Sequence, residues 1–257
     1  MSENETLIVT PWHNPIQRDQ FLKAWRIEAS DPRLILQQDE HRAGCAATKN
    51  AGIKKAIERG ARTIIVLDDD CYPSDEAPHL SDLMEAHLEE LEPQGVEMFS
   101  AVTEPQSRGT PYYDRKLTLP VACSMGFWDG VPDFDAPSQL AGAPGSIRFR
   151  RRAIYGRYFA LSGMNIAFHA TWWPWCQFIE VPRFDDIWMG LLWQKHAYAR
   201  GYCFSTNGPT VRHARQSNVW SNLREEVEWM EANETVWRKI HECPASDYHG
   251  LRSVLPV

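Results

Sequence analysis

Asp68, Asp69 and Asp70 follow directly on the apolar run Thr63–Leu67 and are the residues most suggestive of chemistry. A short aliphatic, β-branched run predicts a buried strand. Three carboxylates cannot lie unpaired inside a sheet, so we expect them at its carboxyl edge, where α/β sheets bind ligands. Carboxylates clustered there suit a hard divalent cation, and a cation suits a diphosphate. The pattern is typical of a nucleotide-sugar glycosyltransferase, although a solvated turn that leads into a helix capped by Ser74 fits these residues equally well.

The first and third aspartates, Asp68 and Asp70, can face the same side of an open turn and share one ion. Asp69 then points into the fold or toward the ribose of the donor. His213 ends a second short strand, Thr210–His213, and a site with two aspartates leaves room for a nitrogen ligand, which favours Mn²⁺ over Mg²⁺. A single histidine is more often a core or surface residue, so His213 matters only in combination with the aspartates.

Asp185 and Asp186 precede a predicted amphipathic helix that ends at Ala199. Aspartate is a good N-cap, which is a sufficient structural reason for acids at this position. The functional alternative is a carboxylate at the edge of a cleft, acting as a general base on an acceptor hydroxyl or stabilising an oxocarbenium-like centre. We therefore take Asp185 and Asp186 as the candidate catalytic residues.

The segment 127–135 combines aromatic rings with acids. The ring of Trp128 could stack on a sugar, and Asp133 and Asp135 could bind its hydroxyls. The alternative is a loop held together by Asx turns.

An arginine cluster and a tryptophan cluster lie close in sequence. The arginines could clamp a diphosphate or contact a polyanion such as DNA, and the indole rings could stack on bases. The alternatives are a solvated surface and ordinary core packing. The residues concerned are Arg148, Arg150, Arg151, Arg152 and Arg157, and Trp172, Trp173 and Trp175.

The composition is that of a globular protein, with 43% hydrophobic and 24% charged residues among 257. The net charge of −7 excludes a general electrostatic attraction to nucleic acid or anionic lipid, so any such binding needs a local patch. No apolar run approaches the roughly 20 residues of a membrane span. The first residues are polar and unlike a signal peptide, and the six cysteines form no Cys-x-x-Cys pair. We expect a soluble cytoplasmic protein with reduced cysteines and no membrane partner.

Strands and helices alternate in the first part of the chain, which predicts an α/β fold with a mostly parallel sheet flanked by helices. The expected strands are 7–10, 34–36, 63–67 and 98–102, and the expected helices are 16–28, 45–59 and 74–91. Residues 109–144 predict a loop-rich, function-bearing stretch. Strand-like chain at 159–168, a helix at 185–199, strands at 202–206 and 210–213 and a helix at 219–240 follow. We expect one domain over 1–257, with a nucleotide-binding half (1–103) and a sugar- and acceptor-binding half (104–257).

Four segments together resemble the plant reversibly glycosylated polypeptides, or UDP-arabinopyranose mutases. The block Val131-Pro132-Asp133-Phe134-Asp135-Ala136-Pro137 is specific, because no constraint of folding demands it. A weaker match runs from His213 to Asn218. The four segments are Ile65-Val66-Leu67-Asp68-Asp69-Asp70-Cys71, Gly126-Phe127-Trp128-Asp129-Gly130 with the block that follows it, Ser162-Gly163-Met164-Asn165-Ile166-Ala167-Phe168, and Arg183-Phe184-Asp185-Asp186-Ile187-Trp188-Met189-Gly190.

The resemblance implies a GT-A (Rossmann-like) fold, a UDP-sugar donor, and a divalent cation at Asp68 and Asp70 with His213 as a further ligand. It also implies that Asp185 and Asp186 lie near the sugar. The donor-binding residues expected from it, beside those already named, are Thr10, Pro11, Trp12, Asp39 and Asn165. The family carries an arginine that becomes glycosylated; Arg115 is the nearest candidate here, and the chain looks shorter than its plant relatives.

These departures favour transfer to an external acceptor. The leading prediction is a glycosyltransferase that uses Mn²⁺ or Mg²⁺ and a UDP-sugar. Its acceptor would be a hydroxymethylated pyrimidine in DNA, flipped out of the stack, as for a virus-encoded enzyme in host cytoplasm. The alternative is a UDP-sugar pyranose–furanose mutase. A third option is a non-catalytic subunit that binds UDP-sugar.

Overall fold

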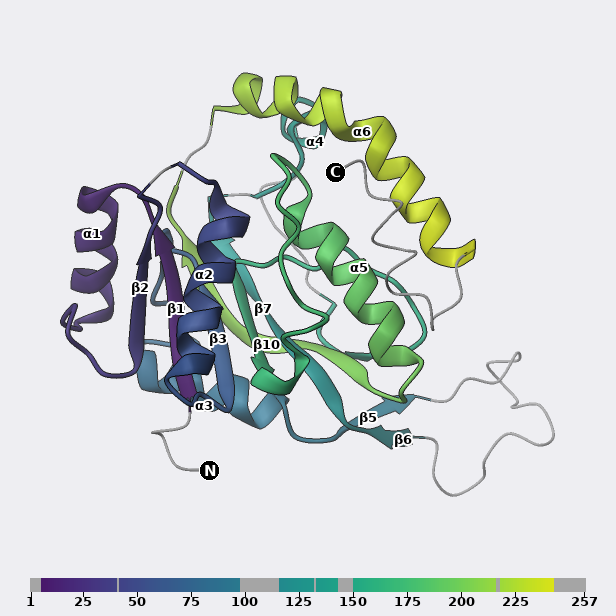
Figure 1. The fold of residues 1–257 in the computed structure, drawn as a ribbon, viewed down its shortest axis with the longest axis horizontal. Coiled ribbons are helices and arrows are strands. Elements are labelled where there is room, and N and C mark those ends of the chain that lie inside the picture. The colour runs from purple at the N-terminus through teal and green to yellow at the C-terminus, as the bar shows by residue number, and fades with distance from the viewer. Residues whose placement is uncertain are drawn as a thin grey trace.

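The structure, a computed structural model, describes residues 6–40, 42–97, 116–131, 133–142, 150–215 and 218–242. One large sheet crosses the molecule in the strand order β2-β1-β3-β9-β7-β10-β4, with β8 paired to β10 (Figure 1). Its strands are β1 (Thr6–Trp12), β2 (Leu34–Gln38), β3 (Thr63–Leu67), β4 (Cys71–Tyr72), β7 (Val121–Gly130), β8 (Ala153–Ile154), β9 (Asn165–His169) and β10 (Cys203–His213). A separate hairpin is formed by β5 (Gln94–Glu97) and β6 (Lys116–Leu119).

Most strands of the large sheet run in one direction. β2, β1 and β3 are mutually parallel, and β7 and β10 are parallel to each other. β9 is antiparallel to both β3 and β7 and joins the two groups, while β4 and β8 are antiparallel to β10. The predicted α/β fold with a mostly parallel sheet is therefore confirmed. Strands from 104–257 lie beside β3, so one sheet joins both predicted halves, whose division of labour stays a prediction.

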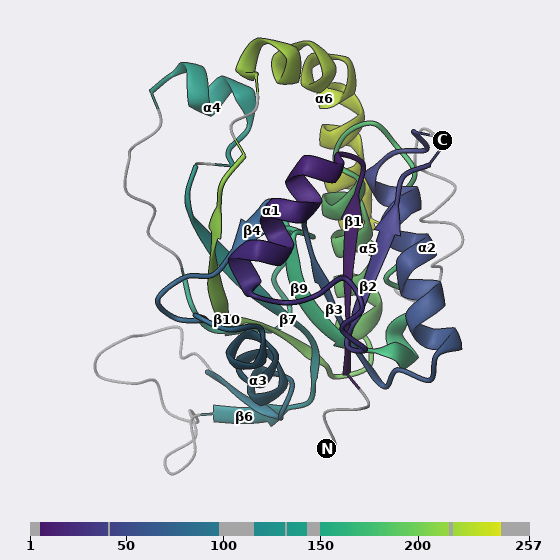
Figure 2. The same ribbon diagram turned by 90° about the vertical axis from the view of Figure 1, so that its left-hand side faces the viewer.

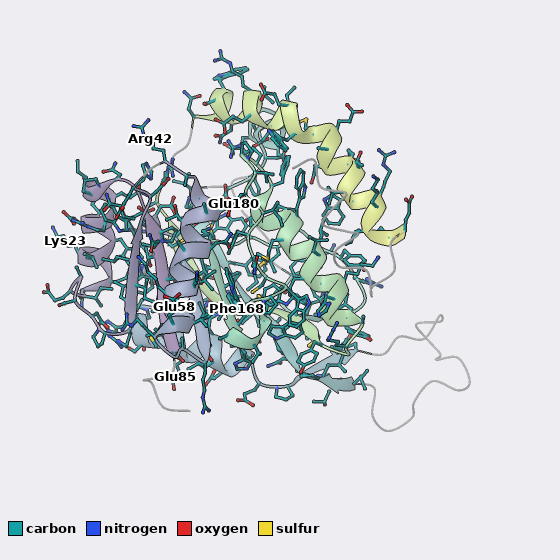
Figure 3. All side chains as sticks on the ribbon, in the orientation of Figure 1. Lys23, Arg42, Glu58, Glu85, Phe168 and Glu180 are labelled. Atoms are coloured by element: carbon teal, nitrogen blue, oxygen red, sulfur yellow. The ribbon has the colours of Figure 1, made fainter. Side chains whose placement is uncertain are left out.

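Helices cover both faces of the sheet (Figures 1 and 2). α2 and α5 lie on one face, together with the fully buried Phe168 of β9, which is labelled in Figure 3. The Phe168 ring packs against Trp193 of α5. α1 and α3 lie on the other, and Phe21 and Trp25 of α1 are buried there. The helices are α1 (Pro15–Trp25), α2 (Cys45–Glu58), α3 (Leu80–Glu90), α4 (Ala136–Leu140), α5 (Asp185–Tyr198) and α6 (Val219–Glu242), with a short 3₁₀ helix η2 (Ala170–Trp172). No helix in the described part of the chain is long and apolar enough to cross a bilayer.

Local sequence explains several boundaries. Asn14 caps α1 by accepting a hydrogen bond from the backbone N–H of Ile16, and Pro15 occupies the first helical position, where a missing N–H costs nothing. Gly60 follows α2 with a φ of +83°, a conformation that glycine adopts without strain. The five residues of β3 are all buried, as their aliphatic sequence predicts.

Three predictions about elements were wrong. β7 runs through the stretch that was predicted as loop. The prediction failed because Ser124 and Gly126 interrupt the apolar pattern that marks a strand. Gly126 is required there, since a side chain would collide with Asn165 of the adjacent β9. The two strands predicted at 202–206 and 210–213 form one bulged strand, β10. α3 begins at Leu80, six residues after the predicted cap, and the predicted strand 98–102 lies outside the described residues.

Candidate active site

Six aspartates gather at the edge of the sheet where β3, β7 and β10 end, and we call them the carboxylate cluster. The run after β3 emerges at this edge as expected, and α5 begins beside it. In Figure 1 this edge faces α4, opposite the β5–β6 hairpin. The cluster consists of Asp68, Asp69, Asp70, Asp133, Asp185 and Asp186, whose mutual electrostatic effects show that they are neighbours.

Lys49 of α2 lies at the base of the cluster and neutralises Asp68. Its Nζ is 2.8 Å from Oδ1 and 3.0 Å from Oδ2 of Asp68, and it also donates to the backbone oxygen of Gly163 at 3.0 Å. Burial, the largest single effect, lowers the pKa of Lys49, but the charges of Asp68, Asp185 and Asp186 together with Cys45 outweigh it and raise the pKa well above its ordinary value. Lys49 is thus a fixed internal cation.

Asp70 and His213 form a second pair. Oδ2 of Asp70 is 3.6 Å from Nε2 of His213, and Nδ1 of His213 is 2.9 Å from the backbone oxygen of Val131. Burial, the largest single effect, lowers the pKa of His213, but the contact with Asp70, the backbone oxygen of Val131 and the charge of Asp133 together outweigh it and raise the pKa to about 9. Burial, the largest single effect, likewise raises the pKa of Asp70, but His213, with the charges of Arg215 and Lys49, holds it below its usual value.

The predicted metal ligands are therefore only partly assembled. Asp70 and His213 face each other, whereas Asp68 is turned toward Lys49. Across the described ranges, no three histidine, cysteine, aspartate or glutamate side chains are arranged to hold one metal ion.

Asp185 and Asp186 occupy the first turn of α5 in different environments. Oδ2 of Asp186 accepts the backbone N–H of Gly163 at 2.8 Å, and Oδ1 accepts that of Ile187 at 2.8 Å. Burial, and then the charge of Asp186, raise the pKa of Asp185 to about 7, against the opposing effect of Lys49. The carboxylate of Asp186 is thus held as a hydrogen-bond acceptor, and that of Asp185 can exchange a proton near neutral pH.

Polar atoms without partners lie at the ends of β1 and β3. Asp69 is almost fully buried, and its Oδ1 accepts a hydrogen bond from Gln17 at 3.2 Å. Its Oδ2 has no hydrogen-bond partner among the described residues, and the same is true of Oγ1 of Thr10 and Nε1 of Trp12. Burial and the neighbouring carboxylates raise the pKa of Asp69 to about 7. Buried polar atoms normally have partners, so the orphans at the ends of these two neighbouring strands mark this edge as a candidate ligand site.

Asp133 and Asp135 have separate surroundings despite their spacing of two. Asp133 is exposed at the cluster, yet enough protein surrounds it for desolvation, helped by Asp186, to raise its pKa. Asp135 instead caps α4, accepting from the N–H of Ser138 at 2.9 Å. Trp128 is half-buried near the end of β7.

Other predicted donor-binding residues support the backbone instead. Oδ1 of Asp39 accepts the N–H of Ala43 at 2.7 Å and so shapes the loop that leads into α2. Asn165 is fully buried, with Oδ1 2.8 Å from Nε2 of His87 and Nδ2 donating to the backbone oxygen of Pro209. Pro11 is buried in β1. Contact of Asp39, Asn165 and Pro11 with a donor therefore stays a prediction.

The tryptophan cluster lies at the opposite edge of the sheet. His169, the last residue of β9, pairs with Thr63, the first residue of β3, and the tryptophans follow it. Trp172 is buried against Trp193 and Tyr202, while Trp175 and Trp173 pack on the same core. These rings fill space between helices and sheet and do not meet the carboxylate cluster.

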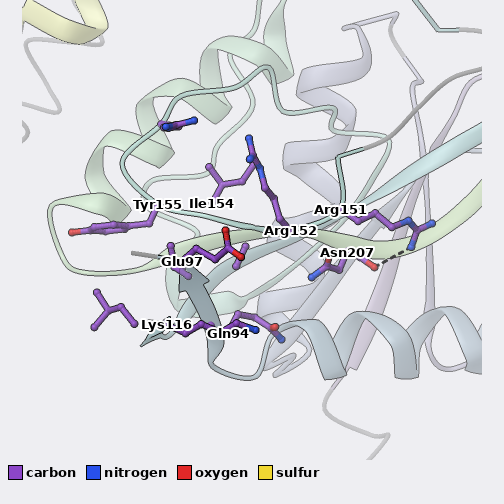
Figure 4. Close-up of a pocket in the computed structure, with 13 residues that line it drawn as sticks. Gln94, Glu97, Lys116, Arg151, Arg152, Ile154, Tyr155 and Asn207 are labelled. Atoms are coloured by element: carbon purple, nitrogen blue, oxygen red, sulfur yellow. Dashed lines mark hydrogen bonds between the residues drawn. The ribbon is translucent and has the colours of Figure 1, made fainter. Parts of the chain in front are cut away.

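The arginine cluster also lies away from the sheet edge that carries the carboxylate cluster. The backbone of Arg150 and Arg152 is bonded to Thr206, near the start of β10, and Arg151 pairs with Glu76 at 2.7 Å. Arg148 and Arg115 lie outside the described residues. A cavity of about 680 Å³ opens beside this segment, lined by Arg151, Arg152, Arg157, Lys116, Tyr155 and the β5 strand among others (Figure 4). Within the described part of the chain, the arginines and tryptophans thus form no common surface with the carboxylates.

Sequence reasoning missed Lys49, Gly163 and Gln17. Lys49 carried a signal, because it shares the spacing of the buried face of α2 with Ala46 and Ile53, and a lysine on an apolar stripe needs a partner. Gly163 gave only a weak signal in the sequence. A side chain on it would come within 2.5 Å of the Phe178 ring and 2.9 Å of Cβ of Asp186, a crowding that only the fold reveals.

Comparison with known proteins supports the resemblance. The family model described as reversibly glycosylated polypeptide matches residues 57–242, more than half of the chain. The chain is 28% identical over 189 residues to the probable UDP-arabinopyranose mutase 1 of Pisum sativum, an alignment that covers 65% of this chain and 52% of that protein.

Two Arabidopsis thaliana proteins are similarly related. The probable UDP-arabinopyranose mutase 4 is 24% identical over 233 residues, covering 80% of this chain and 63% of the relative. UDP-arabinopyranose mutase 3 is 27% identical over 190 residues, covering 65% and 52%. The chain thus spans between half and two thirds of the length of these relatives, and it belongs to the reversibly glycosylated polypeptide family.

Proposed function

We propose that this protein is a UDP-sugar mutase that interconverts the pyranose and furanose forms of the sugar. The observation that carries the proposal is the pair of aspartates at the start of α5 in a chain of this family. Asp186 is held by a backbone N–H, whereas the pKa of Asp185 is raised to about 7. The names of its relatives favour a mutase over a transferase. Because the chain spans only part of those relatives, its activity and substrate are proposals.

The nucleotide part of the substrate is assigned to the ends of β1 and β3. Thr10, Trp12 and Asp69 each carry a buried polar atom without a partner in the described structure, and a ribose or uracil would supply the missing hydrogen bonds. Trp128 and Asp133, at the end of β7 and in the loop that follows, are assigned to the sugar.

Asp70 and His213 are proposed to hold a divalent cation, Mn²⁺ or Mg²⁺. Their spacing of 3.6 Å suits two ligands of one ion, and the bond from Nδ1 of His213 to Val131 leaves Nε2 directed at Asp70. Such a cation would supply positive charge to the diphosphate. Asp68 is paired with Lys49, so Asp70 and His213 alone are proposed as ligands.

Exchange of ring forms breaks the bond between the anomeric carbon and the ring oxygen and forms a bond from the same carbon to another hydroxyl oxygen of the sugar. The proton of that hydroxyl moves to the oxygen released from the ring. Asp186, oriented by two backbone N–H groups, is suited to stabilising positive charge at that carbon. Asp185, whose pKa of about 7 reflects burial beside Asp186, is suited to moving the proton. Lys49 keeps the base of the cluster neutral and fixes Gly163, which orients Asp186.

The test is to incubate the protein with UDP-arabinopyranose and Mn²⁺ and to separate the nucleotide sugars by chromatography. We expect a new isomer without any acceptor, and a loss of about 10²–10⁴-fold in turnover for Asp186→Asn with UDP affinity unchanged. Asp75→Asn, an exposed acid beyond the cluster, is the matched control.

The same mixture with hydroxymethylcytosine DNA tests the other functions. Sugar on the DNA with release of UDP would replace the mutase by the transferase that the sequence favoured, which neither the relatives nor the positions of the arginines and tryptophans support. Binding of UDP-sugar with no product in either mixture would make the protein a binding subunit.

A further inference from the structure

The first half of α6 touches two loops that carry acids of the carboxylate cluster. Figure 1 shows this helix crossing the end of the molecule near α4 and α5. Three of its residues at helical spacing, Asn222, Glu225 and Glu226, contact those loops, so they lie on one side of the helix.

Glu226 is the central contact. Its side chain is only 6% exposed, and Oε2 accepts the backbone N–H of Ala136 at 2.8 Å, in a buried hydrogen bond. Ala136 is the first residue of α4, and a carboxylate is favourable at a helix N-terminus. Burying a carboxylate costs free energy unless it is hydrogen-bonded, so the burial of Glu226 calls for an explanation.

The loop between β7 and α4 is anchored at both ends. At its start, Val131 donates its N–H to the backbone oxygen of His213 at 3.0 Å and accepts from Nδ1 of the same residue. At its end, Ala136 is bonded to Glu226. Asp133 lies between the two anchors, exposed beside Asp70 and Asp186.

The neighbouring contacts of α6 reach the start of α5. Nε of Arg183 is 3.1 Å from Oε2 of Glu225, and its NH2 group donates to Oδ1 of Asn222 at 2.7 Å. Arg183 lies two residues before Asp185, and the intervening Phe184 has a left-handed φ of +64°. The same helix therefore fixes both acid-bearing loops.

We propose that Glu226 is a positioning residue that clamps residues 133–136, so that Asp133 is held over the sugar site while α6 also fixes Asp185 and Asp186. This inference rests on the proposed function for what the site binds, but the clamp itself is independent of it. Loss of the clamp is expected to weaken recognition of the sugar while the UDP portion binds as before.

The experiment combines hydrogen–deuterium exchange with binding of UDP and of UDP-arabinopyranose. Glu226→Leu keeps the volume and removes the acceptor, so exchange in the peptide that contains Ala136 should rise roughly 10–100-fold. The preference for UDP-sugar over UDP should fall in the same variant. Glu226→Gln retains an acceptor oxygen and should restore both properties. Glu228→Leu, an exposed position on the same helix, is the matched control and should change neither.

A change on the loop side guards against a variant that fails to fold. Ala136→Pro removes the donor N–H at a first helical position, where proline is tolerated, and leaves α6 intact. It should reproduce the loss of sugar preference, and its effect should not add to that of Glu226→Leu, since both remove one bond.

Unchanged exchange in Glu226→Leu, or additive effects of the two substitutions, would overturn the clamp. Exchange needs no turnover, so a clamp that is confirmed beside an inactive wild-type protein would refute the mutase proposal alone.

Discussion

Lys49 and Asp68 form an ion pair at the base of the carboxylate cluster, with Nζ 2.8 Å from Oδ1 and the lysine side chain only 4% exposed. The lysine comes from the middle of α2 and the aspartate from the turn after β3. A third contact, to the backbone oxygen of Gly163, ties the pair to the segment that orients Asp186. The position that sequence assigns to a metal-bound carboxylate is thus already neutralised by the protein.

Removal of the lysine should expose the cost of an unpaired buried charge. Lys49→Met is expected to lower the free energy of unfolding by about 3–5 kcal/mol, measured by urea denaturation at pH 7. Lys49→Met with Asp68→Asn should recover much of this loss, because the pair is then replaced by uncharged groups. Equal stability of the single and double variants would mean that Asp68 is not the partner that matters.

Dependence on a divalent cation should reside in Asp70 and His213. UDP affinity of the native protein is expected to rise with Mn²⁺ and to fall on chelation, as titration calorimetry can measure. Asp70→Ala and His213→Ala should each remove the Mn²⁺ effect, whereas Asp75→Ala should keep it. Equal affinities with and without Mn²⁺ in the native protein would remove the cation from the proposal.

The ionisation of Asp185 should make stability depend on pH. Burial beside Asp186 raises its pKa from 3.8 to about 7, so the folded state binds this proton more tightly than the unfolded chain does. The contribution of Asp185 to the free energy of unfolding therefore falls as pH rises from about 4 to about 7, and it is constant above pH 7. Asp185→Asn should raise the free energy of unfolding by about 1–2 kcal/mol at pH 8 and leave it unchanged at pH 4. The gain is limited to this size because the charge of Asp185 is partly solvated. A gain of equal size at both pH values would contradict this origin.

His87 should have the opposite pH dependence. Burial lowers its pKa from 6.5 to about 4, against the weaker effect of its bond to Asn165, and Nδ1 is 2.9 Å from Oγ of Ser124. The folded state disfavours the proton, so this stabilisation is lost as pH falls from about 6.5 through 4. His87→Leu should lower the free energy of unfolding by about 2 kcal/mol at pH 7, because two polar partners are left unsatisfied. At pH 4 the difference should almost vanish, because the native protein has then lost the stabilisation that His87 gives. A cost that stays constant over this range in urea denaturation would show that His87 does not titrate.

Sequence reasoning succeeded where local pattern sets the structure. The aliphatic run before Asp68 predicted β3 with its observed bounds, and the acids after it emerge at the sheet edge because a buried strand cannot hold them. It failed for β7, where the strand crosses the centre of the sheet with Ser124 and Gly126 facing buried polar groups of other elements. Periodicity carries no signal for a strand whose residue types are chosen by its neighbours.

The sequence by itself determined the α/β class, the family and the identity of the acids that meet at the sheet edge, because these follow from apolar periodicity and from a motif that folding does not require. Only the tertiary structure decided which partner each acid has: Lys49 for Asp68, His213 for Asp70 and the N–H of Gly163 for Asp186. Such pairings join segments 19 to 143 positions apart, and a side chain's electrostatics depends on distance in space, which sequence spacing does not encode.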